Sequence, residues 1–355
     1  MAPEVLVIRE FKIFCKPKKL EKMKLIIPMA GMGKRMRPHT LTVPKPLIRI
    51  AGKPIVMRLV EEIVAVSGEK INEIGFVVGH FGEEVENDLI KIAENLGAVG
   101  KIYYQEEALG TAHAILCAAD SLNDKVTVAF ADTLFKADFK LDTEKEAIIW
   151  VHEVEDPSAF GVVKKNGKGI ITDFIEKPKE FVSNEAIIGI YYFKNGENLR
   201  NELQYLVNNN ISKGGEFQLT DALENMKNKG VNFYTGTVTE WLDCGNKNAT
   251  VYTNQRILVN NGIEKLIADS VKNHNSIIIE PCYIGENVVL ENCVIGPYVS
   301  IGENSSVKGS VISNSIIQTN CDIDNSVLDN SMLGNHVKFN GQVNSVSVGD
   351  YTTLT

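Results

Sequence analysis

The chain lacks several features that would place it in a specialised class. Its 355 residues contain no run of about 18 or more apolar residues, so no segment is long enough to span a membrane as a helix. Only six cysteines are present, without a Cys-x-x-Cys pair, which argues against a disulfide framework and a zinc site. The net charge of −8 argues against broad nucleic-acid binding. We therefore expect a cytoplasmic protein without a membrane or nucleic-acid partner.

The start of the chain also lacks the marks of a signal peptide. Residues 1–22 are basic, but they have neither a long apolar stretch nor an Ala-x-Ala cleavage pattern. Met23 begins an apolar strand pattern, so we predict that residues 1–22 form an extension outside the core fold. The remaining chain is long enough for two domains, because 44% of all residues are apolar.

The C-terminal part of the chain repeats itself with a short period. An aliphatic residue returns every five or six positions, and small or polar residues fill the gaps. The aliphatic positions are Ile284, Leu290, Ile295, Ile301, Val307, Ile312, Ile317, Ile323, Leu328 and Leu333. Self-similarity at this period predicts a parallel β-helix, in which each repeat supplies one short strand and one turn of a triangular coil. The aliphatic side chains are expected to fill its interior together with Cys282, Cys293 and Cys321.

Residues 23 to about 240 alternate strand and helix patterns. The predicted strands are Lys24–Pro28, Ile74–Gly79, Lys101–Gln105 and Val126–Ala131, and the predicted helices are Ile55–Val66, Glu83–Asn95 and one from Thr111. This alternation predicts an α/β domain with a mostly parallel sheet, whose ligands bind at the carboxyl ends of the strands. We divide the rest of the chain into this domain (23–246), a helical connector (247–274) and the β-helix (275–355).

The densest group of glycines and charges follows the first predicted strand. Segment 30–40 reads AGMGKRMRPHT, and segment 44–47 reads PKPL. Gly31 and Gly33 allow backbone N–H groups to approach an anion, and the nearby cations indicate a polyphosphate site on this acidic protein. The segment is neither a Walker loop nor a dinucleotide fingerprint, since Met36 stands where a third glycine belongs. An ordinary surface turn with solvated charges is the alternative.

These two segments together resemble the signature of sugar-1-phosphate nucleotidylyltransferases, Gly-x-Gly-Thr-Arg-Leu/Met-x-Pro-x-Thr followed by Pro-Lys-Pro. The resemblance runs from Met23 to about Asn246. It implies a Rossmann-like nucleotidyltransferase domain with a mixed, mostly parallel sheet. In this family a C-terminal left-handed β-helix of hexapeptide repeats is common, and the handedness expected here comes from that resemblance alone.

The resemblance implies roles for the phosphate-loop residues. Ala30, Gly31 and Gly33 would bind the nucleotide. Arg35 would hold its β- and γ-phosphates, and Lys45 would sit on the reacting α-phosphate, where charge builds in the transition state. The chain departs from the family pattern at position 34, where a lysine replaces the usual Thr or Ser.

Segment 105–112, QEEALGTA, resembles the part of the family that binds the nucleobase. Gln105, Gly110 and Thr111 would contribute to nucleotide binding. A glutamine amide can accept from the ring N3–H of uracil or thymine and donate to the carbonyl oxygen beside it, whereas guanine presents a different edge. This favours dTTP or UTP over GTP and does not separate those two. A plain polar residue at a strand end is the alternative for Gln105.

Two aspartates match the family's magnesium ligands. Asp132 ends a buried strand pattern, and Asp243 lies in the segment WLDCGN. Magnesium is usually held by one or two carboxylates together with substrate phosphates, so this pair is sufficient for Mg²⁺ as the cofactor. Isolated aspartates after strands are otherwise common turn formers.

Three further segments resemble the family's sugar site. Gly161 would lie against the pyranose ring. Glu176 would bind sugar hydroxyls, Lys177 would bind the sugar phosphate, and Tyr191 would belong to the far wall. Relatives that act on N-acetylglucosamine or mannose phosphates often have Asn where this chain has Ile187, so a glucose-like sugar is favoured. On its own, the Glu176–Lys177 pair reads as a solvated ion pair.

The reaction implied is transfer of a nucleotidyl group from dTTP or UTP to a sugar 1-phosphate, with release of pyrophosphate. Guanylyl transfer to mannose 1-phosphate and uridylyl transfer to N-acetylglucosamine 1-phosphate are alternatives. A non-catalytic regulatory or assembly subunit is another, and acyl transfer by a β-helix that carries His274 and His336 is a fourth. The flat faces of a β-helix also favour a homo-oligomer.

Overall fold

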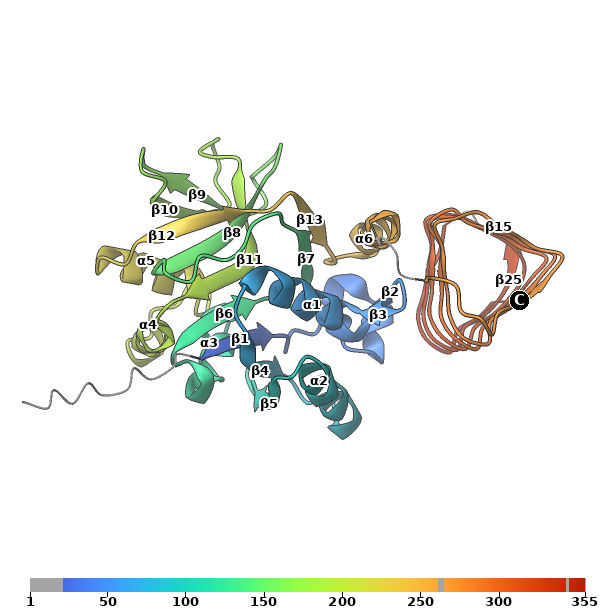
Figure 1. The fold of residues 1–355 in the computed structure, drawn as a ribbon, viewed down its shortest axis with the longest axis horizontal. Coiled ribbons are helices and arrows are strands. Elements are labelled where there is room, and N and C mark those ends of the chain that lie inside the picture. Colours follow the sequence, from blue (N-terminus) through green and yellow to red (C-terminus); the bar gives the residue numbers. More distant parts are fainter. Residues whose placement is uncertain (1–21, 261–264, 343–344, 355) are drawn as a thin grey trace, which may run out of the picture.

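The structure is a computed structural model that describes residues 22–260, 265–342 and 345–354. The predicted N-terminal extension, apart from Lys22, lies outside the described residues. Figure 1 shows an α/β domain beside a triangular coil, with helix α6 (Lys247–Val259) between them. Among the described residues, no helix is long and apolar enough to cross a membrane.

A nine-stranded sheet forms the centre of the α/β domain. Its strands are β1 (Met23–Pro28), β4 (Ile71–Val78), β5 (Val99–Tyr104), β6 (Lys125–Ala129), β8 (Ala147–Glu153), β9 (Gly161–Lys165), β10 (Ile171–Glu176), β11 (Glu185–Phe193) and β12 (Phe233–Thr237). They follow the order β10-β9-β11-β6-β1-β4-β5, with β8 beside β11 and β12 beside β8. The parallel pairs are β5–β4–β1–β6 and β8–β12, whereas β11 runs antiparallel to its neighbours. The predicted mixed α/β fold is confirmed.

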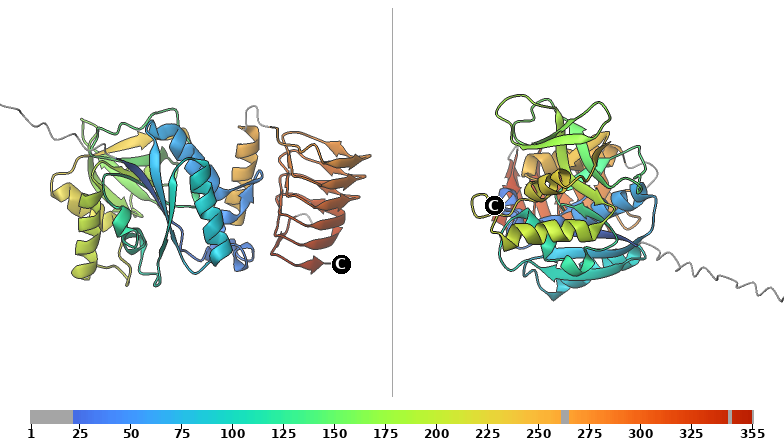
Figure 2. Two further views of the ribbon diagram at one scale, coloured as in Figure 1. Left: turned by 60° about the horizontal axis from the view of Figure 1, so that its bottom comes forward. Right: turned by 90° about the vertical axis from the view of Figure 1, so that its left-hand side faces the viewer.

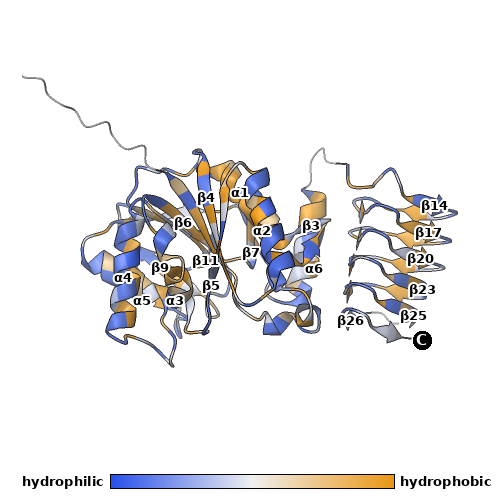
Figure 3. Cartoon of the chain, turned by 90° about the horizontal axis from the view of Figure 1, so that it is seen from below, coloured by the Kyte–Doolittle hydropathy of each residue, from blue (hydrophilic) through white to orange (hydrophobic). Residues whose placement is uncertain are grey.

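The helices cover the two faces of this sheet (Figure 2). Besides α6 they are α1 (Ile55–Ser67), α2 (Glu83–Asn95), α3 (Thr111–Leu116), α4 (Gly196–Asn208) and α5 (Leu219–Asn228). The predicted bounds of α2 are confirmed at both ends, and those of α1 to within one residue. Helix α2 buries Leu89, Ile92 and Ala93, which lie on one face at a spacing of three to four residues. Figure 3 shows how hydrophobic and hydrophilic residues alternate along α2 and α4.

Alternate side chains of β1 point to opposite faces of the sheet, as expected for a strand. Leu25 and Ile27 belong to the hydrophobic core on one face, and Ile26 to the core on the other. All three are fully buried. The apolar run Met23–Pro28 is therefore continuous because both faces are covered.

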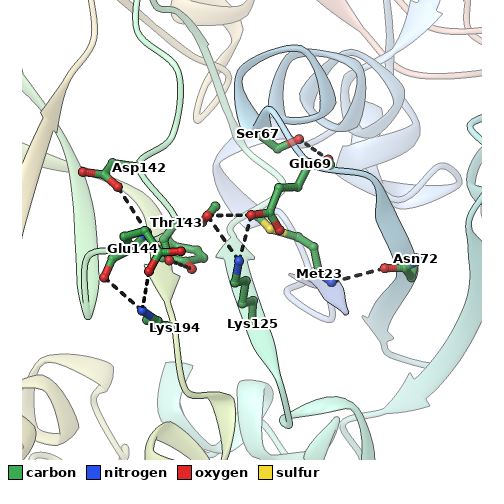
Figure 4. Close-up of polar contacts among 10 residues, drawn as sticks. Met23, Ser67, Glu69, Asn72, Lys125, Asp142, Thr143, Glu144 and Lys194 are labelled. Atoms are coloured by element: carbon green, nitrogen blue, oxygen red, sulfur yellow. Dashed lines mark hydrogen bonds and ion pairs between the residues drawn. The ribbon is translucent and has the colours of Figure 1, made fainter. Parts of the chain in front are cut away.

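A buried ion pair joins two neighbouring loops at the start of the parallel strands (Figure 4). Lys125 is 7% exposed, and its ammonium lies 2.7 Å from a carboxylate oxygen of Glu69. Thr143 Oγ1 donates a 2.6 Å hydrogen bond to the same oxygen. The hydrogen bonds from Lys125 and then Thr143 lower the pKa of Glu69. This cluster fixes the entry of β6 beside the end of α1.

The second part of the chain is a β-helix with three stacks of short parallel strands. The first stack holds β14 (Lys272–His274), β17 (Val289–Glu291), β20 (Ser306–Lys308), the start of β23 (Asp322–Leu328), β25 (Lys338–Gln342) and β27 (Thr353–Leu354). The second holds β15 (Ile277–Ile278), β18 (Val294–Ile295), β21 (Val311–Ile312) and the end of β23. The third holds β16 (Tyr283–Ile284), β19 (Ser300–Ile301), β22 (Ile316–Ile317), β24 (Met332–Leu333) and β26 (Ser347–Val348).

The predicted interior of the coil is confirmed. All ten aliphatic repeat positions are at most 2% exposed and form one hydrophobic cluster. Cys282, Cys293 and Cys321 are buried in the same cluster, each two residues before an aliphatic position. Helix α6 and strand β14 both lie within residues 247–274, which we predicted as the connector between the two domains. The division of the chain into these domains stays a prediction.

The corners of the coil explain its many asparagines. Residues with positive φ recur at the corners, which favours asparagine over branched side chains. They are Asn275, Asn287, Asn292, Asn304, Asn314, Asn320, Asn325 and Asn330, with Tyr298, His336 and Tyr351 at equivalent places. The ring of His336 stacks on that of Tyr351 at 4.7 Å, which suits a structural role for this histidine.

One face of the β-helix packs against the α/β domain. Ile316 and Met332 of the third stack are buried in the same hydrophobic core as β1 and α1. Asn254 of α6 joins the two parts, because its Oδ1 accepts from Ser300 Oγ at 2.6 Å and from the backbone of Ala51 at 3.0 Å. We call this third stack the docked face.

We expect Glu69→Ala to lower the free energy of unfolding at pH 7 by about 1–2 kcal/mol, because the buried Lys125 ammonium loses the carboxylate of the partly exposed Glu69 and keeps only Thr143 as a partner. Folding lowers the pKa of Glu69. The stability that Glu69 contributes is therefore complete when the pH is above the pKa of the unfolded chain, and it is lost as the pH falls through the pKa of the folded protein. Denaturant unfolding between pH 7 and pH 3 therefore checks whether the difference from wild type shrinks in acid.

Glu144→Ala is the matched control, because its ion pair with Lys194 is largely exposed and such pairs contribute about 1 kcal/mol or less. Equal losses of stability for the two variants would contradict the role given to the buried pair.

Candidate active site

The phosphate loop and the lysine that follows it form one wall of a cavity of about 540 Å³ at the carboxyl ends of β1 and β6. Between β1 and α1 the chain forms three short 3₁₀ turns, η1 (Lys34–Met36), η2 (His39–Leu41) and η3 (Lys45–Leu47), and the hairpin β2 (Arg49–Ile50) and β3 (Lys53–Pro54). The carbonyl oxygen of Gly33 accepts from the backbone of Met36 and from Thr40 Oγ1, both at 2.9 Å. The loop is thus folded on itself around Gly33.

The cavity brings together residues that are far apart in the sequence. Its lining is Pro28, Met29, Ala30, Gly31, Met32, Gly33, Lys34, Arg35, Lys45, Pro46, Gln105, Ala108, Gly110, Thr111, Ala114, Phe130, Ala131, Asp132, Glu216 and Gly245. All of the predicted nucleotide-binding residues are in this set, as are Arg35, Lys45 and Asp132. The structure therefore assembles the sequence motifs in one place and leaves their roles as predictions.

An ion pair between Lys45 and Asp132 closes one end of the cavity. The Lys45 ammonium lies 2.9 Å from Oδ2 of Asp132, and the lysine is only 8% exposed. Lys45 follows the phosphate loop, and Asp132 follows β6, the strand next to β1 in the sheet. A buried ammonium needs such a partner, because its desolvation is otherwise costly.

Asp243 lies beside this pair because β7 (Thr133–Lys136) and β13 (Glu240–Asp243) form a two-stranded antiparallel sheet. The backbone N–H of Cys244 donates a 3.0 Å hydrogen bond to the carbonyl oxygen of Asp132. Burial raises the pKa of Asp243, and the charge of Asp132 raises it further. The pairing of two distant strands thus places both predicted metal ligands side by side.

Gly245 allows the close approach of charged groups at this point. Its backbone N–H donates a 2.9 Å hydrogen bond to Oδ1 of Asp243. A Cβ at this position would lie 2.9 Å from both carboxylate oxygens of Asp243 and 3.3 Å from a terminal nitrogen of Arg35. Because Gly245 has no side chain, the carboxylate of Asp243 and the guanidinium of Arg35 can both lie close to its backbone.

The two carboxylates suit a magnesium ion that completes its coordination with substrate phosphates. Oxygen ligands are what Mg²⁺ prefers. Burial, and then the charge of Asp132, raise the pKa of Asp243, and a cation between the two carboxylates would offset both effects. Within the described residues, no group of three or more His, Cys, Asp or Glu side chains is placed to hold a metal by itself. The fit is thus to a metal that arrives with a nucleotide.

Gln105 lies at the other end of the cavity with its amide held by two partners. Its Nε2 is 3.3 Å from the carbonyl oxygen of Gly110 and 3.2 Å from Nδ1 of His113. Gly110 has φ 103° and a Cβ there would lie 2.5 Å from the carbonyl oxygen of Phe217, so this position requires glycine. The segment 105–110 is therefore fixed against the loop before α5.

Glu216 is a residue of the cavity that the sequence analysis missed. It precedes Phe217, whose backbone N–H donates a 2.8 Å hydrogen bond to Leu109 and whose carbonyl oxygen accepts from Ala112. Thr111 joins the same contact, since its Oγ1 accepts from the backbone of Leu219 at 3.0 Å. Nothing in the local pattern around Glu216 indicates a site, because its position depends on this pairing between distant loops.

The predicted sugar-site residues form a second cluster at the β9–β10–β11 end of the sheet. Glu176 pairs with Gly161, and a Cβ on Gly161 would lie 3.0 Å from the Glu176 carboxylate and 3.7 Å from Ile187. Burial, and then the charge of Glu176, raise the pKa of the Tyr191 phenol. The Lys177 ammonium is exposed, 4.0 Å from Glu176.

Phe130 connects the two clusters. It lines the main cavity, and its ring meets that of Tyr191 edge to face at 6.3 Å. A ligand that extends from the phosphate loop past Phe130 would therefore reach Glu176 and Gly161. The structure brings Gly161, Glu176, Ile187 and Tyr191 together, and none of these four lines the main cavity itself.

The β-helix contacts the segment that carries Lys45. Gln318 Nε2 donates a 3.0 Å hydrogen bond to the carbonyl oxygen of Arg49. His39 Nε2 lies 3.1 Å from Ser347 Oγ, and burial lowers the pKa of this imidazole to about 4. These contacts hold both ends of segment 38–49 against the coil.

Two further contacts tighten this junction. Thr42 donates a hydrogen bond to Asp350, and a Cβ on Gly349 would lie 3.0 Å from the side chain of Pro38. The segment between the phosphate loop and β2 is therefore packed between the α/β core and the docked face. None of the β-helix residues that the structure describes lines the cavity, but the β-helix supports the backbone that positions Lys45.

A model of the nucleotidyl transferase family matches residues 24–260 of the chain. The chain is 30% identical to the low-salt glycan biosynthesis nucleotidyltransferase Agl11 of Haloferax volcanii, with 83% of this chain and 87% of that protein covered. It is 27% identical to a glucose-1-phosphate thymidylyltransferase of Streptomyces antibioticus, with the same coverage. A crystal structure of a Bacillus anthracis protein in complex with sucrose matches with a TM-score of 0.57 and 24% identity, covering 68% of this chain and 97% of that one. At that identity the last match shows the fold alone.

We expect Gln318→Leu to speed hydrogen exchange at the backbone amides of Leu47 and Ile48 by about fivefold, because it removes the hydrogen bond to Arg49 and a typical one contributes about 1 kcal/mol. Ser313→Ala, which removes a solvent-side hydrogen bond of the coil to Asp329, is the matched control. Unchanged exchange in Gln318→Leu would mean that the coil does not support this segment.

Proposed function

The chain belongs to the nucleotidyl transferase family, and we propose that it joins dTTP or UTP to a sugar 1-phosphate, with glucose 1-phosphate preferred. The observation that carries the proposal is that Gln105, the phosphate loop and the Lys45–Asp132 pair line one cavity, and that Phe130 of this cavity contacts Tyr191 of the Glu176 cluster. The reactants likewise consist of a base, a triphosphate and a sugar phosphate.

The nucleotide would lie in the main cavity. Backbone N–H groups of Gly31 and Gly33, with the Arg35 guanidinium, would hold the β- and γ-phosphates. The amide oxygen of Gln105 would accept the N3–H of a pyrimidine. Adenine has an acceptor nitrogen at the corresponding place, and guanine presents a different edge, in which an amino group stands beside its N1–H. Thymine and uracil offer the same edge and differ by one methyl group, so the proposal includes both.

In the proposed reaction an oxygen of the sugar phosphate attacks the α-phosphorus of the nucleotide, and pyrophosphate leaves. No protein nucleophile is required, because both reactants are held in line and charge is neutralised around the phosphorus. Lys45 would neutralise the α-phosphate as it gains charge, and Lys177 would hold the sugar phosphate. Asp132 and Asp243 would hold Mg²⁺, which would supply further charge neutralisation when bound.

Lys45 would also affect how the metal binds. In the structure the Lys45 ammonium is paired with Oδ2 of Asp132. A metal ion bound by this oxygen would have to displace the lysine. A metal at Asp132 and Asp243 would release the lysine toward the α-phosphate. The ion pair would therefore hold the site together until the nucleotide arrives.

The sugar would lie against Gly161, with Glu176 accepting from its hydroxyls. Ile187 is partly buried against the neighbouring core and has no hydrogen-bonding group to offer a 2-acetamido or mannosyl substituent. This supports a glucose-like sugar, as does a relative named as a glucose-1-phosphate thymidylyltransferase. Arg35, Lys45, Asp132 and Asp243 are all present, and a non-catalytic subunit would be expected to lack one of them.

We expect Lys45→Ala to lower kcat by about 10²–10³-fold, because its charge acts on the transition state. The magnesium concentration that gives half-maximal activity should not rise and is expected to fall, because Asp132 loses its competing ammonium. Steady-state kinetics and magnesium titration of the same preparations give both quantities. A variant with wild-type turnover, or with a higher half-maximal magnesium concentration, would contradict the two roles given to Lys45.

A pyrophosphate-release assay over four nucleotides and three sugar phosphates tests the proposed function. We expect dTTP and UTP to exceed GTP and ATP, and glucose 1-phosphate to exceed N-acetylglucosamine and mannose 1-phosphates by about tenfold or more in kcat/KM, since one buried polar mismatch costs about 1–3 kcal/mol. Ile187→Asn should narrow the gap for the amino sugar. Ile187→Val, which adds no polar group, should leave it unchanged. A preference for GTP with mannose 1-phosphate would overturn both substrate assignments.

A further inference from the structure

Two acceptors behind Gln105 fix the direction in which its amide points. Its Nε2 lies 3.3 Å from the carbonyl oxygen of Gly110 and 3.2 Å from Nδ1 of His113. A carbonyl oxygen can only accept, so the amide atom beside Gly110 is the nitrogen. This carbonyl oxygen is itself held by α3, because it accepts from the backbone N–H of Ala114 at 3.0 Å. The contact with Gly110 therefore sets the polarity of the whole amide.

The same polarity assigns the proton of the imidazole. Since the amide nitrogen of Gln105 is a donor, Nδ1 of His113 is its acceptor, and the neutral imidazole carries its proton on Nε2. The Sγ of Cys117 also lies near Nδ1, but at 4.0 Å it is the more distant neighbour. An amide nitrogen has two hydrogens, and the two acceptors use both of them. Gln105 therefore has no N–H left to donate to a ligand.

The oxygen of the Gln105 amide is the atom that remains for a ligand. The backbone N–H of Gln105 donates to the carbonyl oxygen of Val78 at 2.9 Å, which anchors the residue just after β5. Gln105 lines the main cavity, whereas His113 does not. Among the residues that the structure describes, none donates a hydrogen bond to Oε1 of Gln105. Because the oxygen and the nitrogen of an amide point in different directions, Oε1 faces the cavity as an acceptor.

A fixed acceptor distinguishes pyrimidines by the protonation of one ring atom. Uracil and thymine have N3–H, which donates to an acceptor, whereas N3 of cytosine is unprotonated and is itself an acceptor. If the amide could turn over, it would offer its N–H groups to cytosine. Discrimination between these bases therefore depends on the contacts that prevent the Gln105 amide from turning.

We propose that His113 is a positioning residue that makes Gln105 selective for the imide edge of uracil or thymine against cytosine. It acts from behind the cavity, through the Gln105 amide. A turned amide would place Oε1 against the carbonyl oxygen of Gly110 and against Nδ1 of His113, so that two repulsive contacts would replace two hydrogen bonds. The inference rests on the proposed function and deepens it, because it concerns the base of the same nucleotide.

Pyrophosphate release with glucose 1-phosphate tests the proposal, with nucleotides compared in the pairs UTP and CTP, and dTTP and dCTP. The sugar is the same within each pair. Wild type should favour the imide nucleotide by about 10²-fold in kcat/KM, because a mismatched edge leaves buried polar groups unpaired.

His113→Leu removes the acceptor and leaves the backbone of α3 unchanged. It should raise KM for UTP or dTTP about fivefold, since one hydrogen bond no longer holds the amide. The value of kcat should stay within about twofold, because a base contact acts equally on the bound substrate and on the transition state. The preference over the cytosine nucleotide should narrow to about tenfold or less, because the turned amide accepts that base. His113→Phe, which keeps a ring without an acceptor, makes the same test if the leucine variant does not fold.

His113→Asn is the conservative rescue, because an asparagine Oδ1 can take the place of Nδ1 and accept from Gln105. It should restore the preference to within about twofold of wild type. Cys117→Ala is the matched control, since it removes the other neighbour of Nδ1 from the same part of the chain and should change neither KM nor the preference. Circular dichroism confirms that each variant is folded.

The possible outcomes separate this inference from the proposed function. A His113→Leu variant that loses activity equally with both nucleotides of a pair would show a structural role and overturn the positioning role. An asparagine variant as unselective as the leucine variant, or a wild type that uses CTP as well as UTP, would also overturn it. Pyrophosphate release from UTP or dTTP leaves the proposed function standing in these cases. A wild type that releases none from either nucleotide would overturn the proposed function and this inference together.

Discussion

The ion pair between Lys45 and Asp132 is the interaction on which the rest of the site depends. It joins the segment after the phosphate loop to the end of the neighbouring strand β6, across the carboxyl edge of the parallel sheet. Both charges lie where a substrate phosphate would reach them. Because the lysine is buried, it cannot leave Asp132 unless another negative group replaces the carboxylate. The same ion pair thus gives the site its shape and makes the release of Lys45 depend on a ligand.

Two distant parts of the chain complete this arrangement. The antiparallel pairing of β13 with β7 brings Asp243 beside Asp132, and the resulting repulsion contributes to the raised pKa of Asp243. On the other side, the docked face of the β-helix holds segment 38–49 through Gln318 and Ser347. Lys45 is therefore positioned by a backbone that is supported on both sides. The β-helix acts on the site through this support.

Much of this architecture is predictable from the sequence where the signal is local and periodic. The β-helix follows from ten aliphatic positions, all of which point inward, and helix α2 follows from its apolar spacing. The phosphate loop, Gln105 and the two aspartates are recognisable because each sits in a short motif that resembles a known family. The asparagines at the corners are also visible in the sequence, and they mark many of the turns of the coil, whereas other turns have Tyr298, His336 or Tyr351 at the equivalent place.

The features that could not be predicted arise from contacts between distant segments. Glu216 enters the cavity because Phe217 pairs with Leu109, and His39 is buried because a coil about 300 residues later in the chain covers it. Neither residue has a local pattern that differs from a surface loop. Strands β8 to β13 were likewise not predicted, because their apolar residues do not distinguish a mixed sheet from a parallel one.

A crystal structure with Mg²⁺ and a non-hydrolysable dTTP analogue tests the central claim most directly. The account predicts that the metal contacts both Asp132 and Asp243, and that the Lys45 ammonium has left Asp132 for the α-phosphate. It also predicts the pyrimidine N3–H on the amide oxygen of Gln105. A complex in which Lys45 still pairs with Asp132 while the α-phosphate is bound elsewhere would contradict the account.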